Sequence, residues 1–570
     1  MKHLSHLVSS DARRFRVLLA AWVLIQIAGT IFQGVQPALA RDSRLATSVD
    51  LLAAMLFLTR WLGLVVIVPL VVQAHPLVGS DAFWMTRPIS WRSLFASKAV
   101  LLGTMMVLVP ALCELALMLA SRVPLAEIAF VTLQSILFQA FWLFLIMALS
   151  ATTRTLAGFA LVVGSMLVAL VLLLNIVVAV MVRNMPEGPR LTVVAGRSVA
   201  NPTGAVIMLT VVIAAAIAQL SVQYRTRSIR AAVGVGLAGV AVAILILVAW
   251  PSHEPPVPVP EWANRESALR LVAEAQKGEF KLFENGPSWS GSDGWQIGGV
   301  RLRLSGVEGG WLATVRLADG TVQFPDGTTL ATAGNGYWSS PVPFESVDDS
   351  PLRVAMRHVL GVSRVRELSH DRFTVEAIPA IVVRQADYRR YSGAFGTYRG
   401  HFLVDLDHLE IAATLPLEPG AEFQDRRRRI VIDQVLRQAQ SASIRLREFT
   451  AATMFDADEL PPVSFYLRNR DAAEAVAGLA REGPGMSAGF ELPLVVGGDV
   501  SSSGRGTGFT VTGNDIRFSD APSGEPIVEI NADWLSHAEL VIVTTVPAGS
   551  VLRSLEISNF AIAAAPATGN

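Results

Sequence analysis

The chain of 570 residues is 52% hydrophobic and only 16% charged, and its mean hydropathy is +0.46. Soluble domains average about 25% charged residues, so this composition excludes an ordinary soluble enzyme. The net charge is zero, but residues 1–254 are apolar and net basic, whereas the rest of the chain is net acidic. The division predicts a membrane domain followed by a soluble domain. The soluble part is acidic, and this charge distribution excludes a nucleic-acid binder, which needs a basic surface.

Seven apolar runs in the first 250 residues are long enough to cross a bilayer, whose hydrocarbon core needs about 20 residues of helix. We expect membrane helices near residues 17–38, 51–74, 99–120, 128–151, 157–182, 204–223 and 231–250. The triplet Ala38-Leu39-Ala40 resembles a signal-peptidase site, and cleavage there would leave six helices. The predicted fold class is therefore an α-helical membrane bundle of six or seven helices, followed by a mainly β, β-sandwich-like domain with some helices.

The distribution of Lys and Arg predicts the orientation in the membrane. Basic residues are more frequent in the segments that share a side with the N-terminus, and short cytoplasmic loops are enriched in such residues. We therefore expect a cytoplasmic N-terminus and, after seven helices, an extracytoplasmic location for residues 251–570. Residues 1–16 carry apolar residues at helical spacing, which predicts either a helix on the inner membrane surface or a frayed tail.

The loop between the second and third runs is the most informative part of the sequence. It reads His75-Pro-Leu-Val-Gly-Ser-Asp-Ala-Phe-Trp-Met-Thr-Arg-Pro-Ile-Ser-Trp-Arg-Ser-Leu-Phe-Ala-Ser-Lys98. Ser80 or Asp81 can cap a short helix through residues 82–86, Pro88 ends that helix, and a second turn is expected over residues 91–98. Two tryptophans supply apolar area of the size that anchors a helix in a partner's groove, although such aromatics also lie at membrane interfaces.

This pattern resembles the permease subunits of ABC-2 type transporters, and the resemblance covers about residues 1–230. It is carried by Asp81, Trp84, Arg87, Pro88, Ile89, Ser90, Arg92, Leu94 and Lys98. The resemblance implies a coupling helix that docks on a separate ABC ATPase subunit, two permease chains in a homodimer or heterodimer, contact with membrane lipid, and a bacterial inner membrane location. The expected function is export driven by ATP hydrolysis. The alternative is a membrane-anchored extracytoplasmic binding or assembly protein without transport activity.

The sequence contains no motif that predicts an enzyme. The Walker phosphate loop, the zinc-protease motif His-Glu-x-x-His and the hydrolase motif Gly-x-Ser-x-Gly are all missing from it. The chain therefore needs a separate ATPase if it transports, and we expect no cofactor and no metal. The single cysteine, Cys113, cannot form a disulfide within the chain.

Four polar residues within the predicted membrane helices are candidates for a function, because polar groups are costly there. Arg60 and Glu114 have similar expected depths, so we predict that they pair between the second and third helices. Gln139 lies on a polar stripe with Thr132 and Ser135, and Asn175 lies deep in the fifth helix. These last residues either line a hydrated path or form hydrogen bonds between helices.

The soluble part begins after a proline-rich linker over residues 251–260. We expect a helix over 261–278, further helices near 349–360 and 471–482, and many short strands with turn residues between them. This pattern predicts two β-rich lobes, 261–460 and 461–570, with a boundary at Pro461-Pro462. Expected strands lie at 295–307, 311–333, 372–385, 398–415, 428–432, 441–449, 463–468, 490–497, 526–531 and 539–546.

Two polar groups of the soluble part could bind a ligand. His401, Asp405, Asp407 and His408 lie within eight residues, and their alternation on a strand predicts either a metal site or a solvated face. The run Arg426–Arg429 predicts contact with an anionic headgroup or a charged substrate, or else a solvated turn or edge strand.

Overall fold

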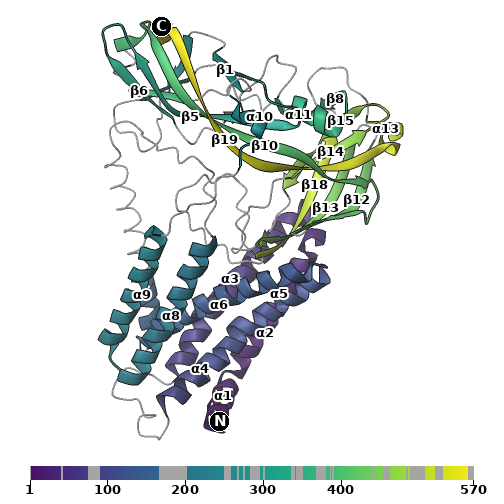
Figure 1. The fold of residues 1–570 in the computed structure, drawn as a ribbon. Helices are drawn as coiled ribbons and strands as arrows, with labels where there is room; N and C mark the ends of the chain where they lie inside the picture. Colours follow the sequence, from purple (N-terminus) through teal and green to yellow (C-terminus); the bar gives the residue numbers. More distant parts are fainter. Residues whose placement is uncertain are drawn as a thin grey trace, which may run out of the picture.

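The computed structural model separates a helical part from a β-rich part (Figure 1). It describes residues 2–39, 43–74, 90–153, 155–165, 202–249, 258–265, 269–273, 277–282, 295–299, 302–334, 340–341, 351–366, 380–384, 387, 390–425, 427–438, 441–452, 463–482, 486–487, 508–519 and 530–562. The N-terminus lies at the end of the helical part that is farthest from the sheets (Figure 1).

The helical part follows the apolar runs of the sequence. Its helices are α1 (Lys2–Arg14), α2 (Arg16–Leu39), α3 (Ser43–Gln73), α4 (Trp91–Gly103), the π-helical segment η2 (Thr104–Leu108), α5 (Val109–Ala120), α6 (Leu125–Ala151), α8 (Pro202–Thr226) and α9 (Ile229–Ala249). The described residues contain four helices long and apolar enough to cross a membrane: Arg16–Val35, Trp91–Ala120, Leu125–Ala151 and Ile207–Thr226. Shorter apolar helices occur at Leu58–Gln73, Leu156–Ser165 and Ile229–Ala243.

The helices pack around one apolar core. It joins α2, α3, α4, α6 and α8 through buried side chains such as Trp22, Val68, Leu102, Met147 and Leu220. Exposed leucines and valines lie on the outer faces of α2, α3, α4, α6 and α9. Apolar side chains on both the inside and the outside of a helical bundle are typical of a bundle surrounded by lipid.

The described β-rich part contains a large sheet, a smaller sheet, the two-stranded sheet β1-β4 and short helices. The strands are β1 (Arg270–Ala273), β2 (Lys277–Leu282), β3 (Trp295–Gly299), β4 (Leu302–Ser305), β5 (Trp311–Gln323), β6 (Thr329–Gly334), β7 (Ser340–Pro341), β8 (Arg364–Arg366), β9 (Ala380–Arg384), β10 (Phe395–Pro416), β11 (Glu422–Gln424), β12 (Arg428–Gln438), β13 (Ser441–Ala452), β14 (Val463–Asn469), β15 (Glu474–Ala477), β16 (Leu479–Glu482), β17 (Met486–Ser487), β18 (Gly508–Ser519) and β19 (Ala538–Ile562). The helices are α10 (Glu261–Asn264), α11 (Pro351–Leu360) and α13 (Ala532–Ser536).

The two longest strands, β10 and β19, form the centre of the larger sheet. They pair antiparallel from Phe395↔Ala561 to Pro416↔Glu539, and the sheet order is β10-β5-β6-β9-β3-β2-β19-β14-β15-β8. Since β10 pairs with β19 as well as with β5, the sheet curls back on itself (Figure 1). Phe402, Val404 and Leu406 of β10 face one core, as their alternation predicts.

The smaller sheet has the order β11-β12-β13-β18-β16 and packs against the larger one. A shared core joins Ile430, Ile432 and Ile444 of the smaller sheet to Phe465 and Ile542 of the larger sheet. The smaller sheet therefore packs on part of the curled larger sheet. β14 and β19, which follow the expected boundary at residues 461–462, belong to the same sheet as β10.

Two predicted helices of the soluble part are wrong. The expected helix over 261–278 is helical only at Glu261–Asn264, and its remainder contains β1 and the start of β2. The alanine-rich segment 471–482 forms β15 and β16, since pairing with β14, β8 and β18 outweighs the helix preference of alanine. The helix expected near 349–360 is confirmed as α11. The expected strand at 490–497 lies outside the described residues.

Candidate functional site

The described part of the coupling-like loop begins at Ser90. Its Oγ accepts a hydrogen bond of 3.1 Å from Ser93 N, so Ser90 caps α4 and the helix starts at Trp91. We expected a separate turn over 91–98 before a membrane helix at 99, but one helix continues from Trp91 into the bundle. The predicted coupling residues Asp81, Trp84, Arg87 and Pro88, and the expected helix over 82–86, lie outside the described residues.

The coupling motif predicted that Lys98 would lie on the surface that faces an ATPase subunit. The structure instead buries Lys98 inside the bundle. Its side chain is fully buried, and Nζ lies 2.7 Å from Oδ2 of Asp11, which is also buried. Asp11 belongs to α1, so the ion pair fastens the N-terminal helix to α4. Phe95 and Tyr224 complete the packing, with ring centroids 5.5 Å apart. Arg92, the second residue of α4, remains exposed.

Arg60 lies against α2 and is directed toward its backbone. Its Nη2 donates to Gln26 O at 3.2 Å and to Thr30 Oγ1 at 3.4 Å. Gly29 provides the room, because a Cβ at this position would lie 2.5 Å from Nη2. Glu114 of α5 lies near Arg60 and near the Ser135 side chain. The predicted coupling between Arg60 and Glu114 remains a prediction.

Gln139 occupies a more specific place than the sequence indicated. It is buried in α6, and with its amide oriented to satisfy its hydrogen bonds it donates to Met106 O at 3.1 Å and Val107 O at 2.9 Å. Its amide oxygen then accepts from Ser135 Oγ at 2.8 Å. These bonds join α6 to the π-helical segment, which agrees with a hydrogen bond between helices. Asn175 lies outside the described residues.

The long helix that begins at Trp91 ends with α5, and a tight turn follows α5. Val123 N donates to Met118 O and Arg122 N donates to Leu119 O, each at 3.1 Å, which is the Schellman pattern. Arg122 has φ of +56°, in the left-handed region that this motif requires after the helix. The turn leaves the carbonyl of Ser121 directed away from the helix, available to an outside donor.

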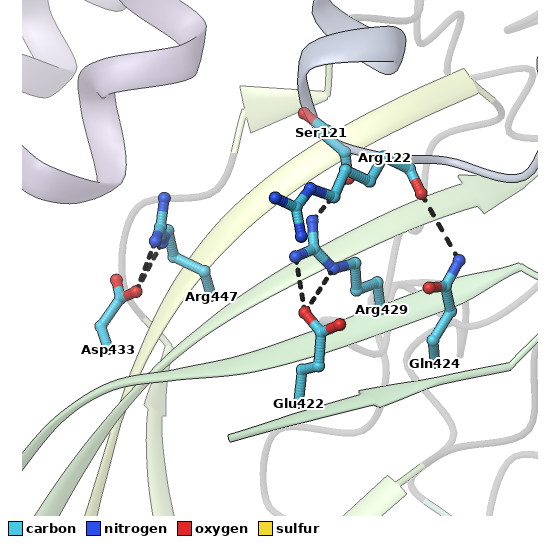
Figure 2. A network of polar contacts seen from close by, with 7 residues as sticks. All are labelled: Ser121, Arg122, Glu422, Gln424, Arg429, Asp433 and Arg447. Carbon is cyan, nitrogen blue, oxygen red and sulfur yellow. Dashed lines mark hydrogen bonds and ion pairs between the residues drawn. The ribbon is translucent and has the colours of Figure 1, made fainter. Parts of the chain in front are cut away.

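That donor is Arg429 of β12. Its Nη1 donates to Ser121 O at 2.7 Å, while Nη2 lies 2.6 Å from Glu422 Oε2 on the neighbouring strand (Figure 2). The guanidinium therefore places a positive charge at the C-terminal end of α5, where the helix dipole favours a cation. Gln424 makes a longer contact, 3.5 Å, with Arg122 O.

Apolar side chains also connect the helices to the smaller sheet beside this polar contact. Met118, Ile128 and Val131 of the helices form one buried cluster with Val431 and Phe449 of the smaller sheet. Arg429 and Arg447 lie over the Phe449 ring, at 5.5 and 5.9 Å from its centroid. The smaller sheet is therefore anchored to the α5–α6 turn by a polar contact and by a small apolar core.

The arginine run is structural in its described part, residues 427–429. Arg428 is fully buried, and its Nε lies 3.0 Å from Glu448 Oε1. The strand that contains Arg428 and Arg429 lies between β11 and β13. The alternatives of a solvated turn or an edge strand are therefore wrong for these two residues, because both arginines are held by carboxylates and Arg429 also holds the helix end.

The histidines and aspartates of β10 make separate contacts with different partners. His401 Nδ1 lies 2.5 Å from Asp319 Oδ1, and Asp405 accepts a 2.5 Å hydrogen bond from Ser550 Oγ. Asp407 is buried, and His408 Nδ1 lies 2.9 Å from Glu410 Oε1. Within the described residues no three such side chains gather as a metal site would require.

No protein-family model matches the sequence, and no curated protein matches it.

Proposed function

We propose that the protein is a membrane-spanning permease subunit of an ABC-type exporter. In this proposal a separate ATPase subunit binds the loop at residues 81–98 on the cytoplasmic side. The bundle has six or seven membrane helices in a bacterial inner membrane, and two permease chains form the transport unit. The β-rich part lies outside the cytoplasm.

The placement of one helix carries the proposal. The stretch Trp91–Ala120 has 30 residues, which is about 45 Å at 1.5 Å per residue and enough to cross a bilayer. The coupling-like loop leads into one end of this helix, and Arg429 of the β-rich part holds the turn at the other end. The loop precedes one end of this continuous helix and the smaller sheet contacts its other end, an arrangement that suits a permease with a cytoplasmic ATPase and an outer domain.

The mechanism follows from this connection. Closure of an ATPase pair would push the loop at 81–98, and α4 would carry the displacement into the bundle. The Lys98–Asp11 ion pair makes α1 move with α4, because separating two buried charges is costly. The bundle would then alternate between inward-open and outward-open states. The sequence lacks a phosphate-binding loop, so the energy source is the separate subunit.

Co-expression with an ABC ATPase encoded beside this chain tests the proposal. We expect the two proteins to purify together from detergent, and the complex in liposomes to hydrolyse ATP. Purification of this chain alone, with no effect on the ATPase, would instead support the alternative function of a membrane-anchored binding or assembly protein.

A further inference from the structure

The long helix Trp91–Ala120 contains an irregular segment in its middle. Residues Thr104–Leu108 form a π-helix between α4 and α5. Val109 N donates to Thr104 O, five residues back, instead of to Met105 O, four residues back. Pro110 follows and has no N–H to donate to Met106 O. The carbonyls of Met105 and Met106 are therefore released from the usual helical bonds.

Side chains from two other helices take up the released carbonyls. Trp22 Nε1 of α2 donates to Met105 O at 3.1 Å, and the Gln139 amide of α6 donates to Met106 O at 3.1 Å and Val107 O at 2.9 Å. Trp22, Met106 and Gln139 are all buried. A backbone carbonyl without a partner is costly in an apolar surrounding, so these donors stabilise the irregular segment.

The two halves of the helix are attached to different parts of the molecule. The first half is tied to α1 by Lys98 and Asp11. The second half ends at Ser121, whose carbonyl binds Arg429 of the smaller sheet. The π-helical segment is the connection between these attachments. π-bulges are rare and are found frequently at functional sites.

We propose that Thr104–Leu108 is a hinge, and that Trp22 and Gln139 are positioning residues that hold it at one angle. Exchange between i→i−5 and i→i−4 hydrogen bonds changes the direction of α5 relative to α4 without unfolding the helix. The bend then sets the position of the smaller sheet relative to the first half of the bundle. This inference does not depend on the identity of the partner ATPase.

Distance measurements between spin labels test the hinge in the full-length protein in nanodiscs. Cys113→Ser removes the single cysteine, so two labelled cysteines can be introduced at exposed positions of one helix. Val100 and Leu119 are 49% and 52% exposed and lie on opposite sides of the π-helical segment. Val17 and Val35, 76% and 43% exposed, form the control pair in α2, which has no such segment.

The expected result is specific to the pair across the hinge. Gln139→Leu and Trp22→Phe should each replace the single narrow 100–119 distance peak by a broadened or shifted one, while the 17–35 peak stays unchanged. Ser135→Ala leaves both donors of Gln139 in place and should change neither peak. In the Pro110→Ala background the new backbone N–H can donate to Met106 O, so Gln139→Leu should change the 100–119 distance peak less.

Two results would overturn the inference. One is an unchanged 100–119 peak in both Gln139→Leu and Trp22→Phe. The other is an equal change at both label pairs, which would show a general loss of packing. If Gln139→Leu does not fold, Trp22→Phe alone decides, because phenylalanine keeps the buried ring and removes only the N–H donor.

Discussion

The Nζ atom of Lys98 lies 2.7 Å from Oδ2 of Asp11, and the two side chains are 0% and 3% exposed. This ion pair joins the first helix of the chain to the helix that follows the coupling-like loop, 87 residues later. Both charges are shielded from water, and their mutual attraction offsets part of the cost of burying them. The pair makes the N-terminal helix an integral part of the bundle instead of a separate surface helix or a frayed tail.

Removal of one member of this pair should destabilise the bundle. Lys98→Met removes the ammonium group from the buried Asp11 carboxylate, and breaking a buried pair costs about 3–5 kcal/mol. The combined variant Asp11→Leu with Lys98→Met should recover most of the loss, measured by thermal unfolding in detergent. Arg92→Met is the matched control, because Arg92 is exposed on the same helix. A double variant as unstable as the sum of its two single changes would show that the charges do not interact.

Arg429→Gln should loosen the smaller sheet from the helices. The change removes the charged donor to Ser121 O, and a hydrogen bond to a charged group contributes about 1.5–3 kcal/mol. Hydrogen exchange should accelerate at residues 121–124 and 427–431 and stay constant in α8. Arg445→Gln is the control, since Arg445 bonds Gln434 within the sheet. Equal exchange in the two variants would contradict the role of Arg429.

Arg60 and Glu114 should show coupling in a double-mutant cycle. A lone charge in a membrane helix costs about 2.5–3.5 kcal/mol or more, so Arg60→Gln and Glu114→Gln should each lower the folded yield in detergent. The combined variant should recover part of this loss. Strict additivity would mean that Arg60 is held by Gln26 and Thr30 alone, and Glu114 would then be the stronger candidate for a role in a substrate path.

The β-rich part should lose stability in acid through Glu539. Partial burial raises the pKa of this carboxyl, but hydrogen bonds and charges from Arg470 and Arg468 outweigh it, so the pKa lies below the ordinary value of 4.5. A lowered pKa stabilises the fold above the unfolded-state pKa, and this contribution disappears as the pH falls through the folded-state pKa. The melting temperature of the unmodified protein should therefore fall more steeply below about pH 4.5 than that of Glu539→Gln. Parallel curves would contradict this.

The apolar runs are helical where the structure describes them, and four of these helices are long enough to span a membrane, because the signal for such a helix is local. Each long apolar run can satisfy its backbone hydrogen bonds only as a helix, and this condition depends on no distant residue. Strand partners depend on residues far along the chain, so the alanine-rich segment 471–482 misleads: its helix preference is weaker than its pairing with β14 and β18. The pairing of β10 with β19 also crosses the lobe boundary that the prolines suggested.

The sequence identified some polar residues of the site but not their partners. The polar residues of the membrane helices stand out by composition, and this signal identified Gln139. Its partners could not be predicted, because they are backbone carbonyls released by Val109 and Pro110. Pro110, in the middle of an apolar run, was the available signal for an irregular helix. Asp11 gave no such signal, since its role depends on the packing of α1 against α4.

The most direct test of the proposed function compares ATPase binding by two folded forms of the chain. The unmodified protein and the variant with Trp84→Ala and Arg87→Ala are co-expressed with the candidate ATPase and purified through a tag on this chain. Matched thermal unfolding and hydrogen exchange in α4 and α6 establish that the variant is folded. The proposal predicts that the unmodified chain retains the ATPase and that the variant loses most of it. Undiminished binding in the folded variant would contradict a coupling role for residues 81–98.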